Sequence, residues 1–333
     1  MKIVLATPNF HQPRGNTITV QRMADGLEKI GVHTQIISIT EDNDITTLPE
    51  SDLVHGFHAY RFYTFMQELT VKPKDYIVTI TGTDLNHNLY DKDTRKDVIA
   101  CLQGARAIHV FHEEAKQMIS TEVPEVTDKL QVLAQGASTF PPMGIIQQKE
   151  PGTFLFALPA GVRRIKNIPF AIDTLRTLYE QDSSIRLWLI GPILEDAEGN
   201  DVKALVEENK EWVTYIGKVP HEEMGAVYHQ ADCILNTSFS EGQSSAILEA
   251  MANEVPVLVA NNEGNASIVQ HEKTGFLYED ASKFLDYAKQ IINDISLREE
   301  LVANAKHYIE ENHSSEHEAT FLLQLYESVL TSN

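Results

Sequence analysis

Two glutamates and several serines lie close together in the stretch SFSEGQSSAILEAMANEVPVLVAN, which spans residues 238–261. A polar loop containing Gly242 precedes a run with helical spacing, and an apolar strand follows. The N-terminus of a helix has free N–H groups and a positive dipole end, so it suits a diphosphate. Ser245 and Glu249 are four positions apart and share a helix face, where a carboxylate suits the paired hydroxyls of a ribose. The alternative is a capped helix in which Glu241 and Glu249 are simply solvated.

A second group that could do chemistry is the cation pair in GVRRIKN, residues 161–167. Arg163 and Lys166 are three positions apart in a glycine-bounded loop that follows a strand and opens a helix. Two cations placed this way at the opening of a helix could bind a negatively charged group. The alternative for this segment is a solvated turn.

The segment PRGNTITVQR brings two arginines close to the start of a predicted helix. A small or anionic acceptor could bind there. A capped helix with a surface arginine explains the same residues. The residues concerned are Arg14, Gly15, Asn16, Thr17 and Arg22.

Several histidines and aspartates could suggest a metal, but their spacing does not. His55 and His58 are three apart and have no carboxylate or cysteine partner at a suitable spacing. The acidic runs at 42–44 and 91–93 resemble solvated loops, because neither ends an apolar strand cleanly. We therefore expect no divalent-metal requirement.

Composition limits the class of protein. The chain has 333 residues, of which 42% are hydrophobic, and a formal net charge of −21. These values suit one large or two ordinary domains and argue against nucleic acid or an anionic membrane surface as a partner. Cys101 and Cys233 lie in apolar or helical stretches, so we expect small core residues. The sequence shows no signal peptide or membrane span, and the expected location is the cytoplasm.

Strands and helices alternate along most of the chain, which predicts parallel sheets covered on both faces. The alternation stops at 136–152, a segment rich in proline and glycine, and then restarts. The chain from residue 282 onward is helical. Open parallel sheets bind ligands outside the carboxyl ends of their strands, so we expect the chemistry there, in a cleft between two halves.

Glu241, Gly242 and Glu249 fit the E-G-x6-E pattern of the retaining glycosyltransferases of family 4, which have the GT-B fold. The segments LEAMANEVPVLVAN and HEKTGFLY resemble that family's continuation, and GVRRIKN resembles its basic donor-diphosphate motif. WLIGP and VTYIGKVP resemble two strands that end in glycine, and RGNT resembles the glycine-rich first loop. Within the family, the chain is most similar to the glycosyltransferase 1 domain-containing group. GNTITVQR and TGTDL also resemble segments of selenosugar synthases.

This resemblance implies two Rossmann-like parallel-sheet domains. Residues 1–140 would form an acceptor-side domain on which a last helix, 314–333, packs back, and 150–313 would bind the nucleotide sugar. The implied reaction transfers a hexose or N-acetylhexosamine, with retention, from a nucleotide diphosphate sugar to a small-molecule or glycan acceptor. We expect a UDP-sugar donor, no cofactor or metal, no membrane insertion, and a monomer or homodimer. Alternatives are a nucleotide-sugar epimerase and a selenosugar- or thiosugar-type synthase on the same fold.

The resemblance also assigns roles to residues. The catalytic residues would be Arg163, Lys166 and Glu241. The donor would contact Gly15, Asn16, Thr81, Asp84, Gly191, Gly217, Lys218, Val219, Gly242, Ser244, Ser245, Ala246 and Glu249. The acceptor would contact Arg14, Thr17 and Arg22.

The chain departs from the family pattern at three places. Thr81 stands where many members have a histidine, so Thr81, Gly82 or Asp84 would have to contact the donor sugar. Ser244 stands where members have a glycine. The acidic residue after VPVLVAN is replaced, with Asn265 or Ser267 nearby.

Overall fold

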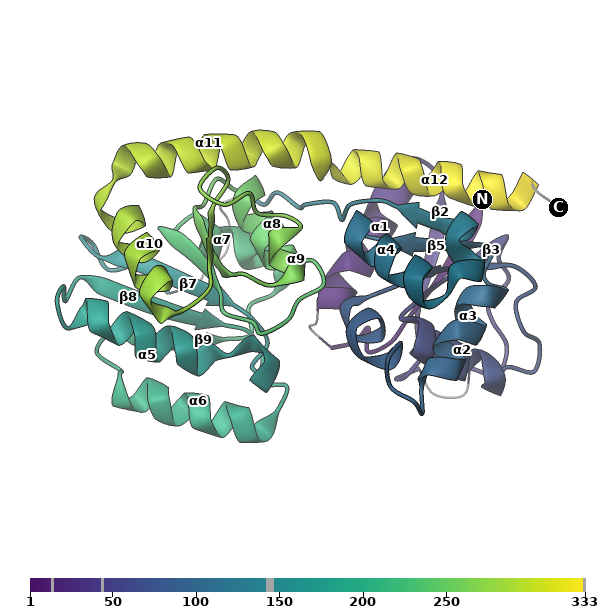
Figure 1. Cartoon of the computed structure of the whole chain (residues 1–333), viewed down its shortest axis with the longest axis horizontal. Helices are drawn as coiled ribbons and strands as arrows, with labels where there is room; N and C mark the ends of the chain where they lie inside the picture. Colours follow the sequence, from purple (N-terminus) through teal and green to yellow (C-terminus); the bar gives the residue numbers. More distant parts are fainter. Residues whose placement is uncertain (13–14, 43–44, 142–146, 332–333) are drawn as a thin grey trace. The chain divides into compact units, whose positions relative to one another are not determined.

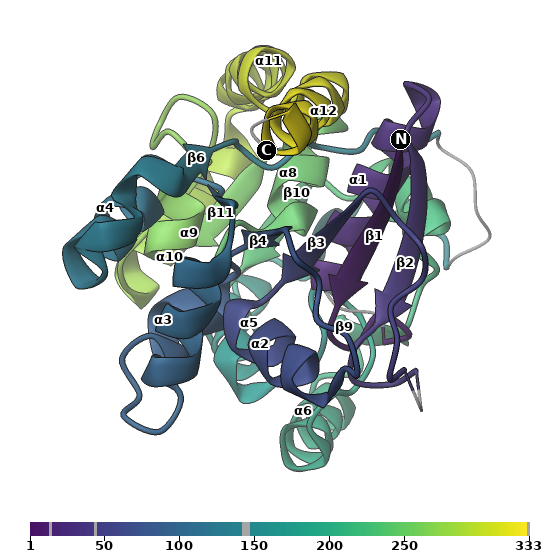
Figure 2. The same cartoon turned by 90° about the vertical axis from the view of Figure 1, so that its right-hand side faces the viewer.

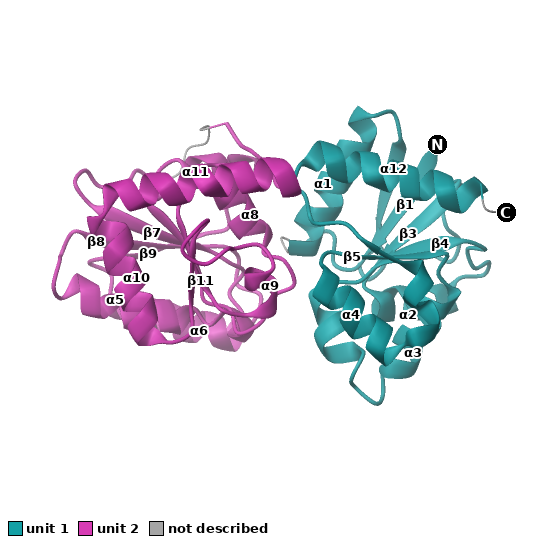
Figure 3. Cartoon of the chain, turned by 45° about the horizontal axis from the view of Figure 1, so that its top comes forward, with its two compact units in different colours: residues 1–136, 313–333 teal, residues 137–312 magenta. Residues whose placement is uncertain are grey.

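The computed structural model describes residues 1–12, 15–42, 45–141 and 147–331. The chain divides into two compact units, which Figure 3 distinguishes by colour. Unit 1 comprises Met1–Gly136 and His313–Asn333, and unit 2 comprises Ala137–Asn312.

Within the described residues, unit 1 has a parallel sheet of six strands in the order β2-β1-β3-β4-β5-β6. Figure 2 shows β1, β2 and β3 side by side, and β1 pairs with both of the others. The strands are β1 (Lys2–Thr7), β2 (His33–Ser38), β3 (Leu53–Phe57), β4 (Tyr76–Thr79), β5 (Ala107–Val110) and β6 (Leu130–Val132). The helices are α1 (Gly15–Lys29), α2 (Ala59–Glu68), a π-helix η1 (Asp84–Asn88), α3 (Arg95–Gly104), α4 (Glu113–Glu122), η2 (Pro124–Lys129) and α12 (Ser315–Thr331).

Both faces of this sheet are buried because apolar residues occupy consecutive strand positions. Val4 and Ala6 of β1 point into a core with α2, α3 and α4. Ile3 and Leu5, one position away, point into the opposite core with α1 and α12.

Unit 2 repeats this plan. Its six described strands are parallel and lie in the order β12-β11-β10-β7-β8-β9. They are β7 (Phe154–Pro159), β8 (Ile185–Ile190), β9 (Val213–Gly217), β10 (Cys233–Asn236), β11 (Val257–Ala260) and β12 (Phe276–Tyr278). The helices are η3 (Arg164–Lys166), α5 (Ile168–Tyr179), α6 (Asp196–Glu208), η4 (His221–Glu223), α7 (Met224–Tyr228), α8 (Ser245–Ala252), α9 (Glu263–Ala266), α10 (Ala281–Asn293) and α11 (Ile295–Asn312).

The two faces of the second sheet are covered by different helices. Figure 1 shows α5 and α6 on one side of it and α8 and α11 on the other. Phe156 and Leu158 of β7 pack toward α5 and α10. Leu155 and Ala157 pack toward α7, α8 and α11. The two parallel sheets confirm the α/β class with two Rossmann-like halves.

The last helix, α12, packs on α1 of unit 1. The two helices approach closely at Gly26, where an added Cβ would lie 3.1 Å from the Cβ of Ala319. Arg22 of α1 forms a bidentate ion pair with Glu318 of α12, and both N···O distances are 2.9 Å. Glu318 Oε1 also accepts the N–H of Gly136, at 3.0 Å. One buried carboxylate therefore joins α12 to α1 and to the residue at which the chain leaves unit 1.

Two further expectations concern the cysteines and the possibility of membrane-spanning helices. Cys101 and Cys233 are buried and neither forms a disulfide, as expected for core residues. None of the helices in the described ranges combines the length and the apolar character that a bilayer crossing requires.

Candidate active site

The centre of the candidate site in unit 2 is a pair of loops at the carboxyl ends of neighbouring strands. Strand β7 pairs with β10, so the loop after each strand reaches the same edge of the sheet. The loops are bonded to each other: the Thr237 hydroxyl donates to the Lys166 carbonyl at 2.8 Å, and the Phe239 N–H donates to the Ile165 carbonyl at 2.9 Å. This brings Lys166, one of the two expected cations, into contact with Glu241, the first expected glutamate.

Glu241 receives three hydrogen bonds on one carboxylate oxygen. The donors are Lys166 Nζ at 2.5 Å, Ser238 Oγ at 2.6 Å and Asn236 Nδ2 at 2.9 Å. Burial acts to raise the pKa of the Glu241 carboxyl group. The Lys166 ammonium and the hydrogen bonds outweigh burial, so this pKa lies below its ordinary value. Glu241 is therefore an ionised acceptor of hydrogen bonds rather than a proton donor.

Arg163 lies just before the short helix η3 that contains Lys166. Its Nε is buried and has no hydrogen-bond partner among the residues that the structure describes. A buried donor without a partner costs free energy, and a ligand anion would remove that cost. The two cations differ in this respect, because Lys166 already holds Glu241.

Helix α8 begins directly after the glutamate loop. Ser244 occupies the N-cap position, but its side chain forms no capping hydrogen bond. The first intrahelical bonds run from the N–H groups of Ile247 and Leu248 to the Ser244 carbonyl, at 3.1 Å each. The N–H group of Ala246 precedes these bonds and lies in the first turn, where N–H groups have no acceptor within the helix. The Ser244 hydroxyl therefore does not cap the helix.

Glycine packing fixes the shape of the loop before α8. A Cβ added to Gly264 of α9 would lie 1.7 Å from the carbonyl oxygen of Gly242. Only glycine at 264 allows that approach, so α9 packs directly on the glutamate loop. Asn265, the next residue, is fully buried and donates to Asn236 Oδ1 at 3.1 Å. Its own Oδ1 is buried without a partner within the described part of the chain.

Glu249, on α8, is 3% exposed. His221 Nε2 lies 2.8 Å from its Oε1, and the Tyr228 hydroxyl donates to its Oε2 at 2.7 Å. Burial, followed by the neighbouring carboxylate, raises the pKa of Tyr228 well above its ordinary value. The phenol therefore stays protonated and donates to Glu249.

Two glycines mark the strand ends expected near the nucleobase. Gly191 follows β8 with a φ of 143°, and Gly217 ends β9 with a φ of 80°. The Gly191 N–H donates to the Gly217 carbonyl at 2.8 Å, and a Cβ at Gly191 would lie 2.2 Å from the Ala160 carbonyl. Lys218 is exposed and Val219 is partly buried in the core beside α8.

The sequence of this chain is similar to those of known glycosyltransferases. Residues 146–308 match the family described as Glycosyl transferases group 1. A relative from Xenopus tropicalis, "Glycosyltransferase 1 domain-containing protein 1", is 29% identical over 91% of this chain and 91% of its own.

The chain is a glycosyltransferase.

Solved structures show its fold to be GT-B, as expected. Sucrose-phosphate synthase from Thermosynechococcus elongatus superposes with a TM-score of 0.80, at 16% identity and over 100% of both chains. HepE from Anabaena, solved in complex with UDP-glucose, superposes with a TM-score of 0.78, at 13% identity and over 100% of both chains.

The residues expected in unit 1 of this glycosyltransferase are placed as follows. Gly15 and Asn16 begin α1, and Thr17 donates to the Gln12 carbonyl at 2.8 Å. Thr17 therefore holds the preceding loop, and Arg14 lies outside the described residues. Arg22 was expected near the acceptor, but its side chain is 6% exposed and paired with Glu318. The Arg22 guanidinium is therefore used in the contact between α1 and α12.

Thr81 and Asp84 were expected near the donor sugar. Asp84 is fully buried and accepts hydrogen bonds from the N–H groups of Ala59 and Thr81, each at 2.7 Å. The Thr81 hydroxyl also donates to Asp84, at 2.7 Å. Asp84 therefore ties β4 to the start of α2, and Thr81 is the more exposed of the two, at 8%.

The histidines considered as metal ligands have other partners. His55 is fully buried and lies 2.7 Å from both the Tyr326 hydroxyl and the Thr79 hydroxyl. His58 precedes α2, and its ring accepts the Arg61 N–H. Within the described ranges, no group of three or more histidine, cysteine, aspartate or glutamate residues is placed to hold a metal ion.

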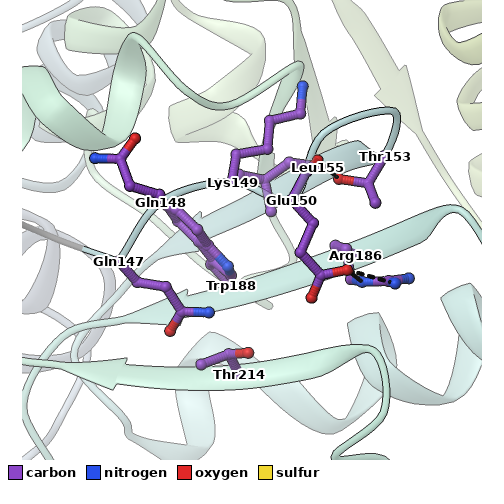
Figure 4. A pocket seen from close by; sticks show the side chains of 9 residues that line it. All are labelled: Gln147, Gln148, Lys149, Glu150, Thr153, Leu155, Arg186, Trp188 and Thr214. Carbon is purple, nitrogen blue, oxygen red and sulfur yellow. Dashed lines mark hydrogen bonds and ion pairs between the residues drawn. The ribbon is translucent and has the colours of Figure 1, made fainter.

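A shallow pocket elsewhere in unit 2 contains none of the expected site residues (Figure 4). Leu155, Arg186 and Thr214, which help to line it, lie near the amino ends of β7, β8 and β9. Ligands of open parallel sheets bind at the other ends of the strands. Arg186 and Glu150 also pair with each other inside the pocket, at 2.9 Å. The glutamate loop, at the carboxyl ends of β7 and β10, therefore remains the candidate site.

Sequence reasoning missed four side chains that surround the two glutamates: Asn236, Ser238, His221 and Tyr228. The only local signal was Asn236, a polar residue that ends the apolar strand CILN. Nothing local marks His221 or Tyr228, because they reach Glu249 from other segments.

Proposed function

We propose that the chain is a retaining glycosyltransferase of family 4 that uses a UDP-sugar. It would transfer a hexose or N-acetylhexosamine to a small-molecule or glycan acceptor without a metal. The observation that carries the proposal is the contact between Lys166 and Glu241 at the start of α8, beside Arg163, whose buried Nε has no hydrogen-bond partner in the described part of the chain.

The diphosphate would lie between the two cations and the helix end. Negative charge grows on the diphosphate as the bond to the sugar breaks. Arg163, Lys166 and the N–H group of Ala246 would stabilise it where it grows. Lys166 has three donors, so it can bind a phosphate oxygen while it holds Glu241.

Glu241 and Glu249 would bind opposite sides of the donor. The ionised Glu241 has lone pairs left to accept hydrogen bonds from the transferred sugar. Glu249 would accept hydrogen bonds from the ribose hydroxyls. This division of roles is supported by the match to the E-G-x6-E pattern.

The base would lie at the end of β9, near Gly217, Lys218 and Val219, and backbone groups would contact it. Uridine is supported by HepE, which was solved in complex with UDP-glucose. The acceptor would bind in unit 1 near the start of α1, where Thr17 lies next to Gly15 and Asn16, which would contact the donor.

The first experiment is a binding screen. UDP, GDP and ADP, and then the UDP-sugars of glucose, galactose and their N-acetylamino forms, are titrated by calorimetry and thermal shift with and without EDTA. A ligand that binds only the native state raises its stability by mass action. We expect UDP to bind most tightly and EDTA to have no effect, and a binding preference for GDP or ADP would overturn the choice of base.

The second experiment identifies the reaction. The donor that binds is incubated with candidate acceptors, and the anomeric configuration of the product is read by NMR. An α-linked product from an α-linked donor supports retention, and a β-linked product contradicts it. Release of an epimer of the donor sugar without any acceptor would favour the epimerase.

A further inference from the structure

We propose that His221 and Tyr228 are positioning residues for Glu249. They hold its carboxylate so that its remaining lone pairs face the ribose hydroxyls of the donor. This inference deepens the proposed function and rests on it.

Within the described residues, the side chains that contact the Glu249 carboxylate are those of His221 and Tyr228, whereas Glu241 is paired with Lys166. Its side chain is 5% exposed, so water can contribute little to its solvation. A buried carboxylate is costly unless hydrogen bonds replace the lost water. His221 and Tyr228 supply one bond to each carboxylate oxygen, at 2.8 Å and 2.7 Å.

These two hydrogen bonds fix the plane of the Glu249 carboxylate and leave some of its lone-pair sites without a hydrogen bond. A carboxylate offers about four lone-pair sites. After one bond to each oxygen, about two sites remain, which equals the number of hydroxyls in a ribose diol. A carboxylate held at both oxygens can therefore receive the diol without reorientation, which lowers the cost of binding.

Tyr228 is itself held rigidly. It is 1% exposed, and its ring stacks on that of Phe140, with the centroids 6.0 Å apart and an angle of 27° between the planes. A Cβ at Gly225 would lie 2.1 Å from the Pro141 carbonyl, so glycine in α7 permits this close packing. The position of the Tyr228 hydroxyl is therefore set by the core.

His221 holds the other oxygen from a more open side. Its side chain is 32% exposed, and its ring meets Phe140 edge-on with the centroids 4.9 Å apart. A carboxylate oxygen accepts hydrogen bonds, so Nε2 of His221 is the donor in this contact. One ring, Phe140, thus supports both partners of Glu249.

The test compares two ligands that differ only in the diol, UDP and 2′,3′-dideoxy-UDP. Hydrogen bonds to a charged group contribute enough that we expect the wild type to prefer UDP by about tenfold to a hundredfold in Kd. Tyr228→Phe keeps the stacked ring and removes one bond, so the preference should fall several-fold toward one. A mutation that merely weakens folding would not change this ratio.

His221 is tested by a pair of substitutions. His221→Leu removes the donor and should lower the preference for the diol, whereas His221→Gln keeps an N–H donor and should restore part of it.

Tyr179→Phe is the matched control for Tyr228→Phe. Tyr179 also donates to a carboxylate, that of Glu211 at 3.3 Å, but it lies on α5. The control should keep the wild-type ratio.

The outcomes separate the inference from the proposed function. If the wild type binds neither ligand, or if Glu249→Ala keeps the full preference for UDP, the proposed donor site is wrong and the inference falls with it. If Glu249→Ala abolishes the preference while Tyr228→Phe and His221→Leu retain it, only the inference is wrong. If His221→Leu binds UDP more tightly than the wild type, then His221 competes with the ribose hydroxyls for the Glu249 carboxylate. That result would also overturn the inference.

Discussion

The ammonium of Lys166 lies 2.5 Å from a carboxylate oxygen of Glu241, although 75 positions separate them in the chain. The loops that carry them follow β7 and β10, which are neighbours in the sheet. Lys166 therefore has two tasks in the proposed reaction: it keeps Glu241 ionised and it stabilises the leaving diphosphate.

Replacing Lys166 should lower turnover more than affinity. In Lys166→Ala the diphosphate keeps Arg163 and the helix end, so binding of UDP should weaken only modestly. Loss of one group that stabilises the transition state typically lowers kcat by about a hundredfold or more. Release of UDP from the donor measures kcat, and calorimetry measures Kd.

Lys289→Ala is the control for this substitution, because Lys289 is exposed on α10. It should retain wild-type kcat and Kd. A Lys166→Ala enzyme with unchanged kcat would show that the cation pair has been misassigned.

Replacing Glu249 should act mainly on binding. Glu249→Ala removes the acceptor of the ribose hydroxyls, so the Kd for UDP should rise by about tenfold or more. A contact made equally in the ground and transition states changes KM and leaves kcat at saturating donor nearly unchanged. Glu300→Ala, an exposed position on α11, should match the wild type. An effect confined to kcat would contradict the assigned role.

The buried pair of Arg22 and Glu318 should be important for the stability of unit 1. Arg22→Ala leaves a carboxylate that is 1% exposed without its cation. Breaking a buried pair in this way costs about 3–5 kcal/mol of unfolding free energy. The double substitution Arg22→Met with Glu318→Leu removes both charges and should recover much of that loss. Denaturant titration followed by circular dichroism measures both.

The surface pair of Lys210 and Glu207 provides the comparison, because both side chains are more than half exposed. Lys210→Ala should leave the denaturation midpoint unchanged. A double substitution of Arg22 and Glu318 that is no more stable than Arg22→Ala would show that the ion pair itself, rather than the unpaired charge, accounts for the loss.

The buried histidines of unit 1 should make its stability depend on pH. Burial, together with the nearby His109, holds the pKa of His55 well below its ordinary value of 6.5. Burial also lowers the pKa of His109. Below about pH 6.5 the unfolded chain takes up protons that the folded chain cannot, so the unfolding free energy should fall as the pH falls further.

Denaturation midpoints measured between pH 8 and pH 5 test this expectation. His55→Phe removes one such group, so its midpoint should vary less with pH than that of the wild type. His33→Gln is the control, since the His33 side chain is 80% exposed, and should keep the wild-type slope. A wild-type midpoint that is constant down to pH 5 would contradict the account.

Much of the architecture could be predicted without coordinates. Alternating apolar strands and amphipathic helices indicated two parallel sheets, and the spacing of Glu241, Gly242 and Glu249 marked the opening of α8. Such signals are readable because strand alternation and helical spacing act over a few residues. Arg22 and Asp84 show the limit of this reasoning. The local segment suggested a ligand contact for Arg22 and the family resemblance suggested one for Asp84, but the fold buries both in internal hydrogen bonds.

Residue types and their local spacing were therefore sufficient for the class of the fold and for the segments that carry the chemistry. The partners of each charged group depended on strand order, which places β10 beside β7 and joins loops distant in sequence. Lys166 meets Glu241, and His221 and Tyr228 meet Glu249, only because packing brings separate segments to one edge of the sheet. Short-range sequence patterns do not determine the strand order, because that order depends on burying both faces of the whole sheet at once.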